Sequence, residues 1–349
     1  MAGPEAHFRI HEWSVLERAA ARGDIGLGED YIAAAWETED LEKLIAFFLL
    51  NIDDLEGFAY GDLFHRHLFA LYNNFVRRNS LSGSKRNIEA HYDVGNDFYS
   101  LWLDETMTYS SALYQTPEQP LANAQRNKYG RLLSKIGDRK ASILEVGCGW
   151  GGFAEQAVDA GHDVTGLNIS PAQHGYASGR LGSKADIRLQ DYRAARGTFD
   201  AIVSIEMVEA VGERYWPVYF RTLAERLKDG GKAMLQAIVI RDELFDVYRT
   251  RSDFIRHYVF PGGLLPSVSR LREEADRAGL KLRESFLFGQ DYARTLREWS
   301  ARMRARESEI RVLGYDDKML RNWQYYLGIC AAAFSIGRTD VAHLEFVRA

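Results

Sequence analysis

The stretch SILEVGCGWGG (residues 142–152) decides the fold class of this chain. It is a short apolar run that ends in glycines, and the helical pattern FAEQAVDA (153–160) follows it. Gly147, Gly149 and Gly152 match the spacing G-x-G-x-x-G, in which glycines allow a sharp turn and a close approach of the backbone to a ligand. The stretch therefore predicts a strand, a ligand-binding loop and a helix, in that order.

Further apolar runs follow the glycine loop, and helical stretches separate them. Strand and helix in alternation are typical of a parallel sheet with helices on both faces, so we expect an α/β fold. A polar, arginine-rich stretch at about 240–310 predicts a helical insertion between late strands, and the apolar runs near 326–335 and 341–347 would supply the last edge strands. The expected strands are 142–149, 162–170, 185–192, 199–207 and 230–240, and the expected helices are 153–160, 171–181 and 217–229.

The residues around the glycines distinguish between two classes of cofactor. A dinucleotide fold places an acid near the end of the second strand to hold a ribose, whereas here that strand ends in LNIS (167–170) without an acid. Glu145 precedes the glycines instead, where a carboxylate would suit an α-ammonium group. Asp191 and Tyr192 end the third strand, where they would meet the edge and face of an adenine. These features favour S-adenosylmethionine (SAM), and a nicotinamide cofactor is the alternative.

Composition excludes several classes of protein. The 349 residues suffice for two domains, and 46% hydrophobic with 27% charged residues exclude a disordered or collagen-like chain. The net charge of −5 argues against a general nucleic-acid binder. Two cysteines, Cys148 and Cys330, cannot form a disulfide scaffold or a four-thiolate zinc site, so we expect no metal and a reducing, cytoplasmic compartment. The N-terminus has no apolar core of signal-peptide length, and the most apolar early stretch, 44–52, is too short to span a bilayer, so any action on a membrane is expected from its surface.

The first 80 residues predict a mainly helical domain. Its third segment has apolar residues at helical spacing, which favours packing on a core, and contact of this face with lipid is the alternative. The second segment begins with turn-forming glycines at 23, 26 and 28. The expected helical segments are about 12–21, 23–36 and 40–58.

Residues 75–87 have the composition of a linker, with frequent Ser, Gly and Asn. Four cations lie there without an acid, and two histidines and an arginine lie just upstream. Such a cluster predicts either a solvated face or a docking site for anionic lipid headgroups. The second interpretation predicts peripheral association with a membrane. The cations are Arg77, Arg78, Lys85 and Arg86.

A series of motifs resembles one family, the cyclopropane fatty acid synthases and mycolic acid methyltransferases. The resemblance covers about residues 23–345. It implies a class I SAM-dependent methyltransferase fold (Rossmann-like, mostly parallel sheet), with an N-terminal, mainly helical, lipid-associated domain at 1–80 and a catalytic domain at 81–349. The motifs are HYDVGNDFYSLWLDETMTYSSALY (91–114), EVGCGWGGFA (145–154), TGLNISPAQ (165–173), QDYR (190–193), FDAIVSIEMVEAVG (199–212), YVFPGGLLPS (258–267) and LGYDDKMLRNWQYYLGICAAAF (313–334).

The resemblance also implies two sets of site residues, one that binds SAM and one that is catalytic, in which a bound bicarbonate ion serves as the base. Within the second set, Ser111 and Gln236 stand where many members have Cys and His, and Ala210 stands where a His is common. Ser and Gln still donate hydrogen bonds to an anion, but the pocket loses an imidazole. The implied SAM-binding residues are Tyr109, Ser110, Glu145, Gly147, Gly149, Asn168, Ile169, Ser170, Gln173, Asp191 and Tyr192; the implied catalytic residues are Glu209, Tyr292, Gln236, Ser111, Ile238 and Cys330.

The implied activity is methyl transfer from SAM to the double bond of unsaturated acyl chains of membrane phospholipids. We expect a cyclopropane fatty acid as the product, and a methyl-branched unsaturated chain is the alternative because the pocket differs at Ser111 and Gln236. Alternatives of other classes are a nicotinamide-dependent oxidoreductase and a non-catalytic lipid-binding protein. Glu209, Tyr292 and the complete glycine loop argue against the last of these. We expect a cytoplasmic protein at the membrane surface without a nucleic-acid partner, and the resemblance is compatible with a homodimer.

Overall fold

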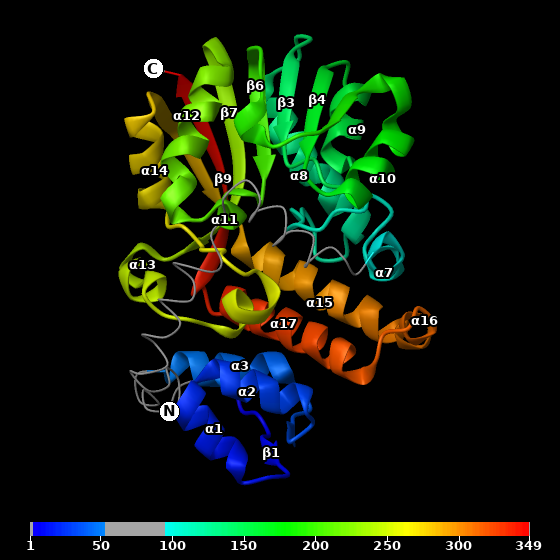
Figure 1. Ribbon diagram of the computed structural model, residues 1–349, viewed down its shortest axis with the longest axis vertical. Coiled ribbons are helices and arrows are strands. Elements are labelled where there is room, and N and C mark those ends of the chain that lie inside the picture. Colours follow the sequence, from blue (N-terminus) through cyan, green and yellow to red (C-terminus); the bar gives the residue numbers. More distant parts are fainter. Residues whose placement is uncertain (1–2, 53–94, 349) are drawn as a thin grey trace.

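The computed structural model of this protein describes residues 3–52 and 95–348, and its centre is a seven-stranded sheet (Figure 1). The strands lie in the order β5 (Asp186–Leu189), β4 (Asp163–Asn168), β3 (Ser142–Val146), β6 (Phe199–Ile205), β7 (Leu227–Ile240), β9 (Thr339–Arg348) and β8 (Leu280–Leu287). The first five strands in this order are parallel, and β9 runs antiparallel to both of its neighbours. The predicted mostly parallel sheet is confirmed.

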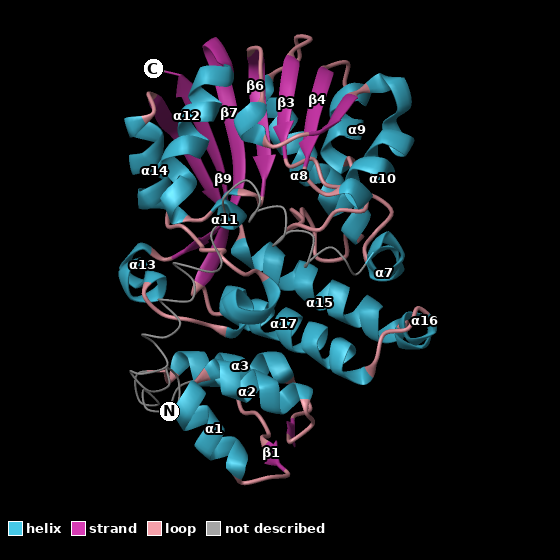
Figure 2. Ribbon diagram, in the orientation of Figure 1, coloured by secondary structure: helices cyan, strands magenta, loops and turns pink. Residues whose placement is uncertain are grey.

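Helices cover both faces of the sheet, because successive side chains of each strand point to opposite faces. Ile143 packs in one hydrophobic cluster with Phe153, whereas the next residue, Leu144, packs in a second cluster with Phe220. Figure 2 shows the two layers of helices around the strands. The first layer contains α8 (Leu121–Ile136), α9 (Gly152–Asp159) and α10 (Pro171–Leu181), and the second contains α12 (Trp216–Arg226) and α14 (Val268–Arg277).

A further group of helices lies below the carboxyl ends of the strands (Figure 1). Helices α15 (Gly289–Ala305) and α17 (Asp317–Ser335) pack together there, and the N-terminal helices pack on α17. The rings of Tyr31 and Tyr325 stack at 5.3 Å between centroids, and both belong to the same hydrophobic cluster as Trp36 and Leu296. The N-terminal helices thus share one core with α15 and α17. The remaining elements of this layer are α1 (Ser14–Arg22), α2 (Asp24–Ile32), α3 (Leu41–Leu50), α7 (Gly95–Trp102), α16 (Glu307–Val312), β1 (Arg9–Ile10) and β2 (Trp36–Glu37).

The late part of the chain differs from the expectation in two places. The expected insertion at 240–310 contains α13 (Asp242–Arg249), the π-helical turn η4 (Ile255–Val259) and α14, but strand β8 interrupts it. Buried Leu280 and half-buried Leu282 alternate with exposed Lys281 and Arg283 there, so the charges that suggested a polar helix belong to an edge strand.

The apolar run at 326–335 lies in α17 and not in a strand. Its alanines favour a helix, and the helices packed around it leave no polar face that periodicity could reveal. The run at 341–347 does form a strand, β9, but that strand lies between β7 and β8 and not at an edge.

The glycines of α2 serve packing and not a turn. Of the three early glycines, Gly23 alone has the positive φ of a turn, +62°. A Cβ on Gly28 would lie 2.4 Å from Cδ2 of Phe254 and 2.6 Å from Cε1 of Tyr325. Gly26 is similarly close to the carbonyl of Arg18. These positions therefore let α2 approach its neighbours more closely than a side chain would permit.

Of the expectations that concern membranes, one falls on residues that the structure does not describe and one can be compared with the described helices. The predicted basic cluster and the boundary near residue 80 lie outside the described residues. Across 3–52 and 95–348, no helix combines the length and the apolar character needed to cross a bilayer.

Candidate active site

A cavity lies at the carboxyl ends of β3, β4 and β6, where the loops that follow these strands meet. Parallel α/β sheets bind their ligands in this position. Ser170 stands outside the lining as the N-cap of α10, where its Oγ accepts the backbone N–H of Gln173 at 3.3 Å. The other ten residues expected to bind SAM line the cavity: Tyr109, Ser110, Glu145, Gly147, Gly149, Asn168, Ile169, Gln173, Asp191 and Tyr192.

The glycine loop adopts a backbone conformation that side chains disfavour. Gly147 and Gly149 have φ of +85° and +51°. A Cβ on Gly149 would meet no atom within 4 Å, so the space beside it is open. Asn168 holds the turn, because its Nδ2 donates to the carbonyl oxygen of Gly149 at 2.8 Å and its Oδ1 accepts the N–H of Ser170 at 3.0 Å. Asn168 thus positions the loop.

Glu145 has the surroundings expected of a partner for an ammonium group. The residue is 3% exposed, lines the cavity, and its Oε2 has no hydrogen-bond partner among the described residues. Burial raises the pKa of Glu145 to about 8, against the effect of nearby Lys128. A buried carboxylate oxygen without a donor is costly, and the α-ammonium of SAM would supply that donor. The glycine loop and Glu145 together fit SAM.

Asp191 and Tyr192 follow β5 and line the same cavity. Arg193 binds both oxygens of Asp191: Oδ1 accepts from Nε at 2.8 Å, and Oδ2 accepts from Nη2 at 2.7 Å. Each carboxylate oxygen accepts more than one hydrogen bond, so Asp191 keeps capacity for an adenine amino group. The ring of Tyr192 packs edge-on against Tyr219, with centroids 5.6 Å apart. Their predicted contacts with adenine stay predictions.

Residues 107–110 line the cavity, and a buried lysine of α8 lies behind them against Ser110. The ring of Tyr109 lies 5.3 Å from that of Trp299. Lys128, which is 0% exposed, donates from Nζ to Oγ of Ser110 at 2.6 Å. Burial lowers the pKa of Lys128 to about 7, although nearby carboxylates, Glu206 foremost, act in the opposite direction. Lys128 is not among the site residues predicted from the sequence, although a lysine on the apolar face of a helix is an unusual feature that could have indicated it.

Glu206 connects the cavity to most of the expected catalytic residues, and sequence analysis did not single it out. It follows β6 directly and lines the cavity. Its Oε1 accepts the backbone N–H of Ser111 at 2.9 Å and Nε2–H of Gln236 at 2.7 Å, and its Oε2 accepts the hydroxyl of Tyr292 at 2.7 Å. Three residues that the resemblance assigns to bicarbonate therefore bind this carboxylate. The feature of the sequence that could have indicated Glu206 is an acid directly after a buried strand, where parallel sheets bind their ligands.

Glu209 takes the fourth expected donor, the backbone N–H of Ile238, with its Oε1. Its Oε2 is buried without a partner among the described residues. Burial, with a smaller contribution from Glu206, raises the pKa of Glu209 to about 8. Glu206 or Glu209 thus already accepts from all four residues expected to donate to a bicarbonate, although Ser111 donates its backbone N–H and not the expected hydroxyl. The residues present do not fit a bicarbonate bound at that position.

A buried histidine orients Gln236. The register of β7 and β9 places Gln236 opposite His343, and Nε2 of His343 lies 2.8 Å from Oε1 of Gln236. Because Nε2 of Gln236 donates to Glu206, its Oε1 must accept, which assigns the proton to Nε2 of His343. Burial holds the pKa of His343 well below its usual value, so the ring stays neutral. Position 236 thus carries no imidazole in this chain, but the imidazole of His343 lies directly behind Gln236 and is hydrogen-bonded to it.

Two expected catalytic side chains point elsewhere. The hydroxyl of Ser111 donates to the carbonyl of Ala112 at 3.0 Å, so its backbone N–H and not its side chain reaches Glu206. Cys330 lies in α17 and outside the cavity lining. Burial raises the pKa of its thiol, with Asp253 adding to this effect, so Cys330 stays protonated at neutral pH. A protonated, half-buried thiol outside the cavity is typical of an unreactive cysteine.

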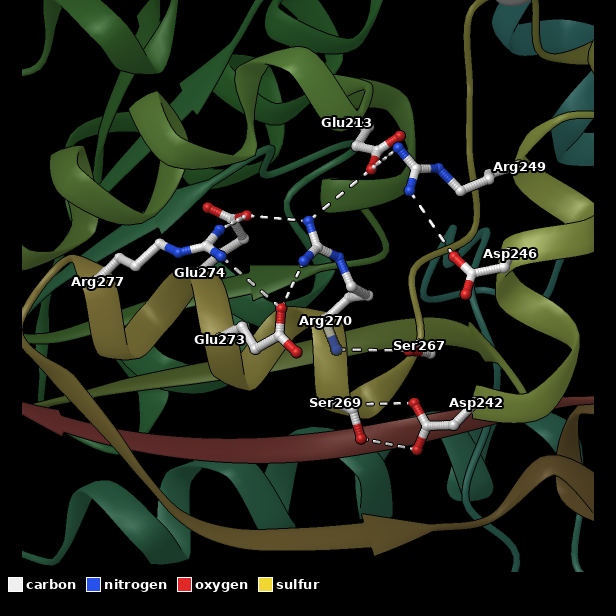
Figure 3. A network of polar contacts seen from close by, with 10 residues as sticks. All are labelled: Glu213, Asp242, Asp246, Arg249, Ser267, Ser269, Arg270, Glu273, Glu274 and Arg277. Atoms are coloured by element: carbon white, nitrogen blue, oxygen red, sulfur yellow. Dashed lines mark hydrogen bonds and ion pairs between the residues drawn. The ribbon is translucent and has the colours of Figure 1, made fainter.

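A network of ion pairs (Figure 3) begins just after the short helix that carries Glu209, α11 (Val208–Val211). Glu213 follows this helix and meets Arg249 of α13 at 2.9 Å and Arg270 of α14 at 3.8 Å. Arg270 also reaches the buried carboxylate of Glu274 at 3.2 Å. The network therefore ties the segment between β7 and β8 to the wall of the site.

Known proteins resemble this chain along most of its length. Residues 79–344 match the family described as mycolic acid cyclopropane synthetase. The chain is 34% identical to tuberculostearic acid methyltransferase UfaA1 of Mycobacterium tuberculosis, over 97% of this chain and 82% of that protein. It is 31% identical to cyclopropane-fatty-acyl-phospholipid synthase of Escherichia coli, over 98% of this chain and 88% of that protein. Among solved structures, mycolic acid cyclopropane synthase CmaA1 complexed with SAH and CTAB is similar, with a TM-score of 0.71, 29% identity, and coverage of 75% of this chain and 98% of that chain.

Proposed function

This chain belongs to the mycolic acid cyclopropane synthetase family and is a SAM-dependent methyltransferase, and from that premise we propose that it methylates the double bond of unsaturated fatty acyl chains of phospholipids. The observation that carries the proposal is a cavity lined by the glycine loop, the buried carboxylate of Glu145 and a second, half-buried carboxylate, Glu206. The first two features fit SAM. The third suits a reaction that creates positive charge and then releases a proton.

When bound, SAM supplies an electrophilic methyl group on a sulfonium. Glu145 would hold the α-ammonium, the glycine loop would let the backbone approach the ligand, and Asn168 keeps that loop in place. Orientation of the two reactants supplies much of the rate in such a reaction, because an alkene is a weak nucleophile. By holding SAM in a fixed orientation, the glycine loop would also direct the methyl group toward the alkene.

Methyl addition leaves a carbocation in the acyl chain. Such a cation persists only where water is excluded and where carboxylates or aromatic faces offset its charge. Glu206 and the ring of Tyr109 both line the cavity and would serve in this way. The catalytic roles of four further residues stay predictions: Glu209, Tyr292, Gln236 and Ile238. Gln236 and Tyr292 donate to Glu206, and the backbone N–H of Ile238 donates to Glu209, which supports these roles.

Two products follow from the same cation. Loss of a proton from the new methyl group closes a cyclopropane, which is the product we propose first because the family description and the name of the Escherichia coli relative both indicate it. Loss of a proton from a neighbouring carbon gives a methyl-branched alkene. The second candidate is supported by the pocket, in which Ser111 and Gln236 surround a protein carboxylate, and by a relative named as a tuberculostearic acid methyltransferase.

Lipid mass spectrometry after incubation with SAM and unsaturated phospholipid vesicles tests the function. We expect a product heavier by one CH₂ group, and degradation to locate the added carbon distinguishes a ring from a branch. Calorimetry should show binding of SAM and not of NAD. No mass increase with any unsaturated lipid, together with binding of NAD, would instead support the oxidoreductase alternative.

The membrane and the oligomeric state form a second part of the proposal. We propose peripheral association through the basic cluster, which the four cations at 77, 78, 85 and 86 support. Binding to anionic vesicles should weaken as salt increases, and it should weaken when Arg77 and Arg78 are replaced by Ala. Equal binding to neutral and anionic vesicles at low salt would contradict this. The expected homodimer can be checked by sedimentation of the purified protein.

A further inference from the structure

We propose that the carboxylate of Glu206 takes the place of a bicarbonate ion in this enzyme and accepts the proton that the methylated acyl chain releases. The inference rests on the proposed function for its second half, the proton transfer. Its first half, the replacement of the anion, rests on hydrogen bonds that involve no ligand. The two halves can therefore be tested separately.

The donors around Glu206 come from three separate parts of the chain. Ser111 precedes α8, Gln236 lies in β7 and Tyr292 lies in α15, and all three donate to Glu206 at 2.7–2.9 Å. Convergent donors of this kind form a binding site for a small oxyanion. Here a side chain of the protein occupies it. Oε1 accepts two of the hydrogen bonds and Oε2 accepts one, so Oε2 retains capacity to accept a proton.

The backbone indicates that this placement is maintained at a cost. Glu206 has φ +48°, a conformation that is uncommon for any residue with a Cβ. Such strain persists where the surroundings fix the residue, and it is concentrated at functional sites. The neighbouring pair of β7 and β9 contributes to this fixation, because His343 holds the amide of Gln236 in the orientation that donates to Glu206.

The electrostatic surroundings make Glu206 more basic than an ordinary carboxylate. Burial raises the pKa of Glu206, while Lys128 and the three donors act in the opposite direction and stabilise the ionised form. Glu209 differs, because among residues 3–52 and 95–348 its side chain accepts an interresidue hydrogen bond from Ile238 alone, and because it faces the like charge of Glu206. Of the two carboxyl groups, Glu206 is the one surrounded by donors and a cation.

The proposed step balances without a further reactant. The methyl carbon forms a bond to one alkene carbon as its bond to sulfur breaks, and the other alkene carbon becomes cationic. Glu206 then takes a proton from the new methyl group or from a neighbouring carbon, and the electrons of that C–H bond close a cyclopropane or form a new double bond. The carboxylate becomes a carboxylic acid, which returns its proton to solvent before the next turnover.

The experiment uses two substitutions of Glu206 and ¹³C-labelled bicarbonate. Glu206→Gly vacates the donor cluster and relieves the positive φ, whereas Glu206→Gln keeps the site filled with a neutral amide. Titrations followed by ¹³C NMR should show bicarbonate binding to the glycine variant and not to the native enzyme or the glutamine variant. Glu298→Gln is the matched control, because Glu298 also accepts a tyrosine hydroxyl (Tyr114, 3.1 Å) but lies outside the cavity lining.

Turnover measured in bicarbonate-depleted buffer completes the test. Native enzyme and the Glu298→Gln control should remain active, and both Glu206 variants should lose a factor on the order of 10² or more. Added bicarbonate should restore activity to Glu206→Gly alone. Thermal melting and SAM calorimetry check that each variant is folded and binds its cofactor.

Three results would overturn the inference: bicarbonate binding to the native enzyme at this site, loss of native turnover on depletion, or retained turnover in Glu206→Gln. A different result would overturn the proposed function. If no lipid gains mass while the glycine variant alone binds the labelled anion, Glu206 occupies the anion site of an enzyme with another substrate.

Discussion

At the scale of single residues, we expect Gly149 to let the backbone approach SAM closely. Its φ is +51° and the space beside its Cα is open. We expect Gly149→Val to place its side chain in that space and to weaken SAM binding at least tenfold, about 1.4 kcal/mol, as calorimetry would measure.

Backbone strain alone could weaken binding, so a second glycine serves as the control. Gly161 has φ +90° and open space around it, but it lies in the exposed turn after α9 and outside the cavity lining. Gly161→Val should lower the melting temperature by a similar amount and leave SAM affinity unchanged. Equal affinities for both variants and the native enzyme would contradict the assignment of the glycine loop.

The carboxyl group of Glu209 makes stability depend on pH. Burial and the neighbouring Glu206 raise its pKa to about 8 from the usual 4.5 of a glutamate. Between these values the unfolded chain loses the proton that the folded chain keeps, so this group lowers the free energy of unfolding as pH rises through that window. We expect denaturant unfolding to show a larger loss from pH 5 to pH 8 in the native protein than in Glu209→Gln, by on the order of 1 kcal/mol.

The other titrating groups are present in both proteins, so the difference between the two reports Glu209 together with its interaction with Glu206. An equal loss of stability in the native protein and in Glu209→Gln would show that this carboxyl group titrates as an exposed one. A smaller loss in the native protein would contradict the sign of the shift.

At the scale of elements, α2 packs through its glycines. A Cβ on Gly28 would lie within 2.4–2.7 Å of ring atoms of Phe254 and Tyr325, which are buried and cannot move freely. We expect Gly28→Ala to destabilise the protein by about 1–3 kcal/mol through overpacking, measured by chemical denaturation.

Gly175 offers the opposite case in another helix. It lies inside α10, and a Cβ there would meet no atom within 4 Å. Gly175→Ala should therefore stabilise the protein by about 0.5–1 kcal/mol, because alanine loses less backbone entropy in a helix. Destabilisation by both substitutions, or by neither, would contradict the distinction drawn from packing.

At the scale of the whole molecule, the N-terminal helices and α15 with α17 share one hydrophobic cluster. Trp36 belongs to this cluster, is 0% exposed, and donates from its indole to the carbonyl of Leu27 at 2.8 Å. We expect Trp36→Ala to cost about 3–5 kcal/mol and to shift a single transition of the entire chain. Far-UV and near-UV circular dichroism should report the same midpoint.

Trp13 is the matched control because 78% of it is exposed. Trp13→Ala should change stability by less than about 0.5 kcal/mol. If Trp36→Ala produced two transitions and shifted the first of them alone, the N-terminal helices would be an independent unit, as the sequence-based boundary near residue 80 suggested.

The sequence by itself determined the features that depend on neighbours in the chain. The strand, glycine loop and helix at 142–160 form a local unit, and the missing acid at 167–170 with Glu145 indicated SAM. The alternation of apolar runs from 142 to 240 likewise predicted five parallel strands, because each run carries its own hydrophobic pattern. Local patterns failed at 326–335, where a helix buried on several sides has no polar face to distinguish it from a strand.

Only the tertiary structure decided how distant residues meet at the reaction site. Glu206 receives donors from Ser111, Gln236 and Tyr292, which are 95, 30 and 86 positions away in the chain. His343 reaches Gln236 because β9 enters the sheet beside β7, a pairing that no local pattern specifies. Hydrogen bonds and burial act between groups that are close in space, whatever their separation in sequence. For that reason the sequence indicated a methyltransferase, and the fold alone placed a protein carboxylate where an anion was expected.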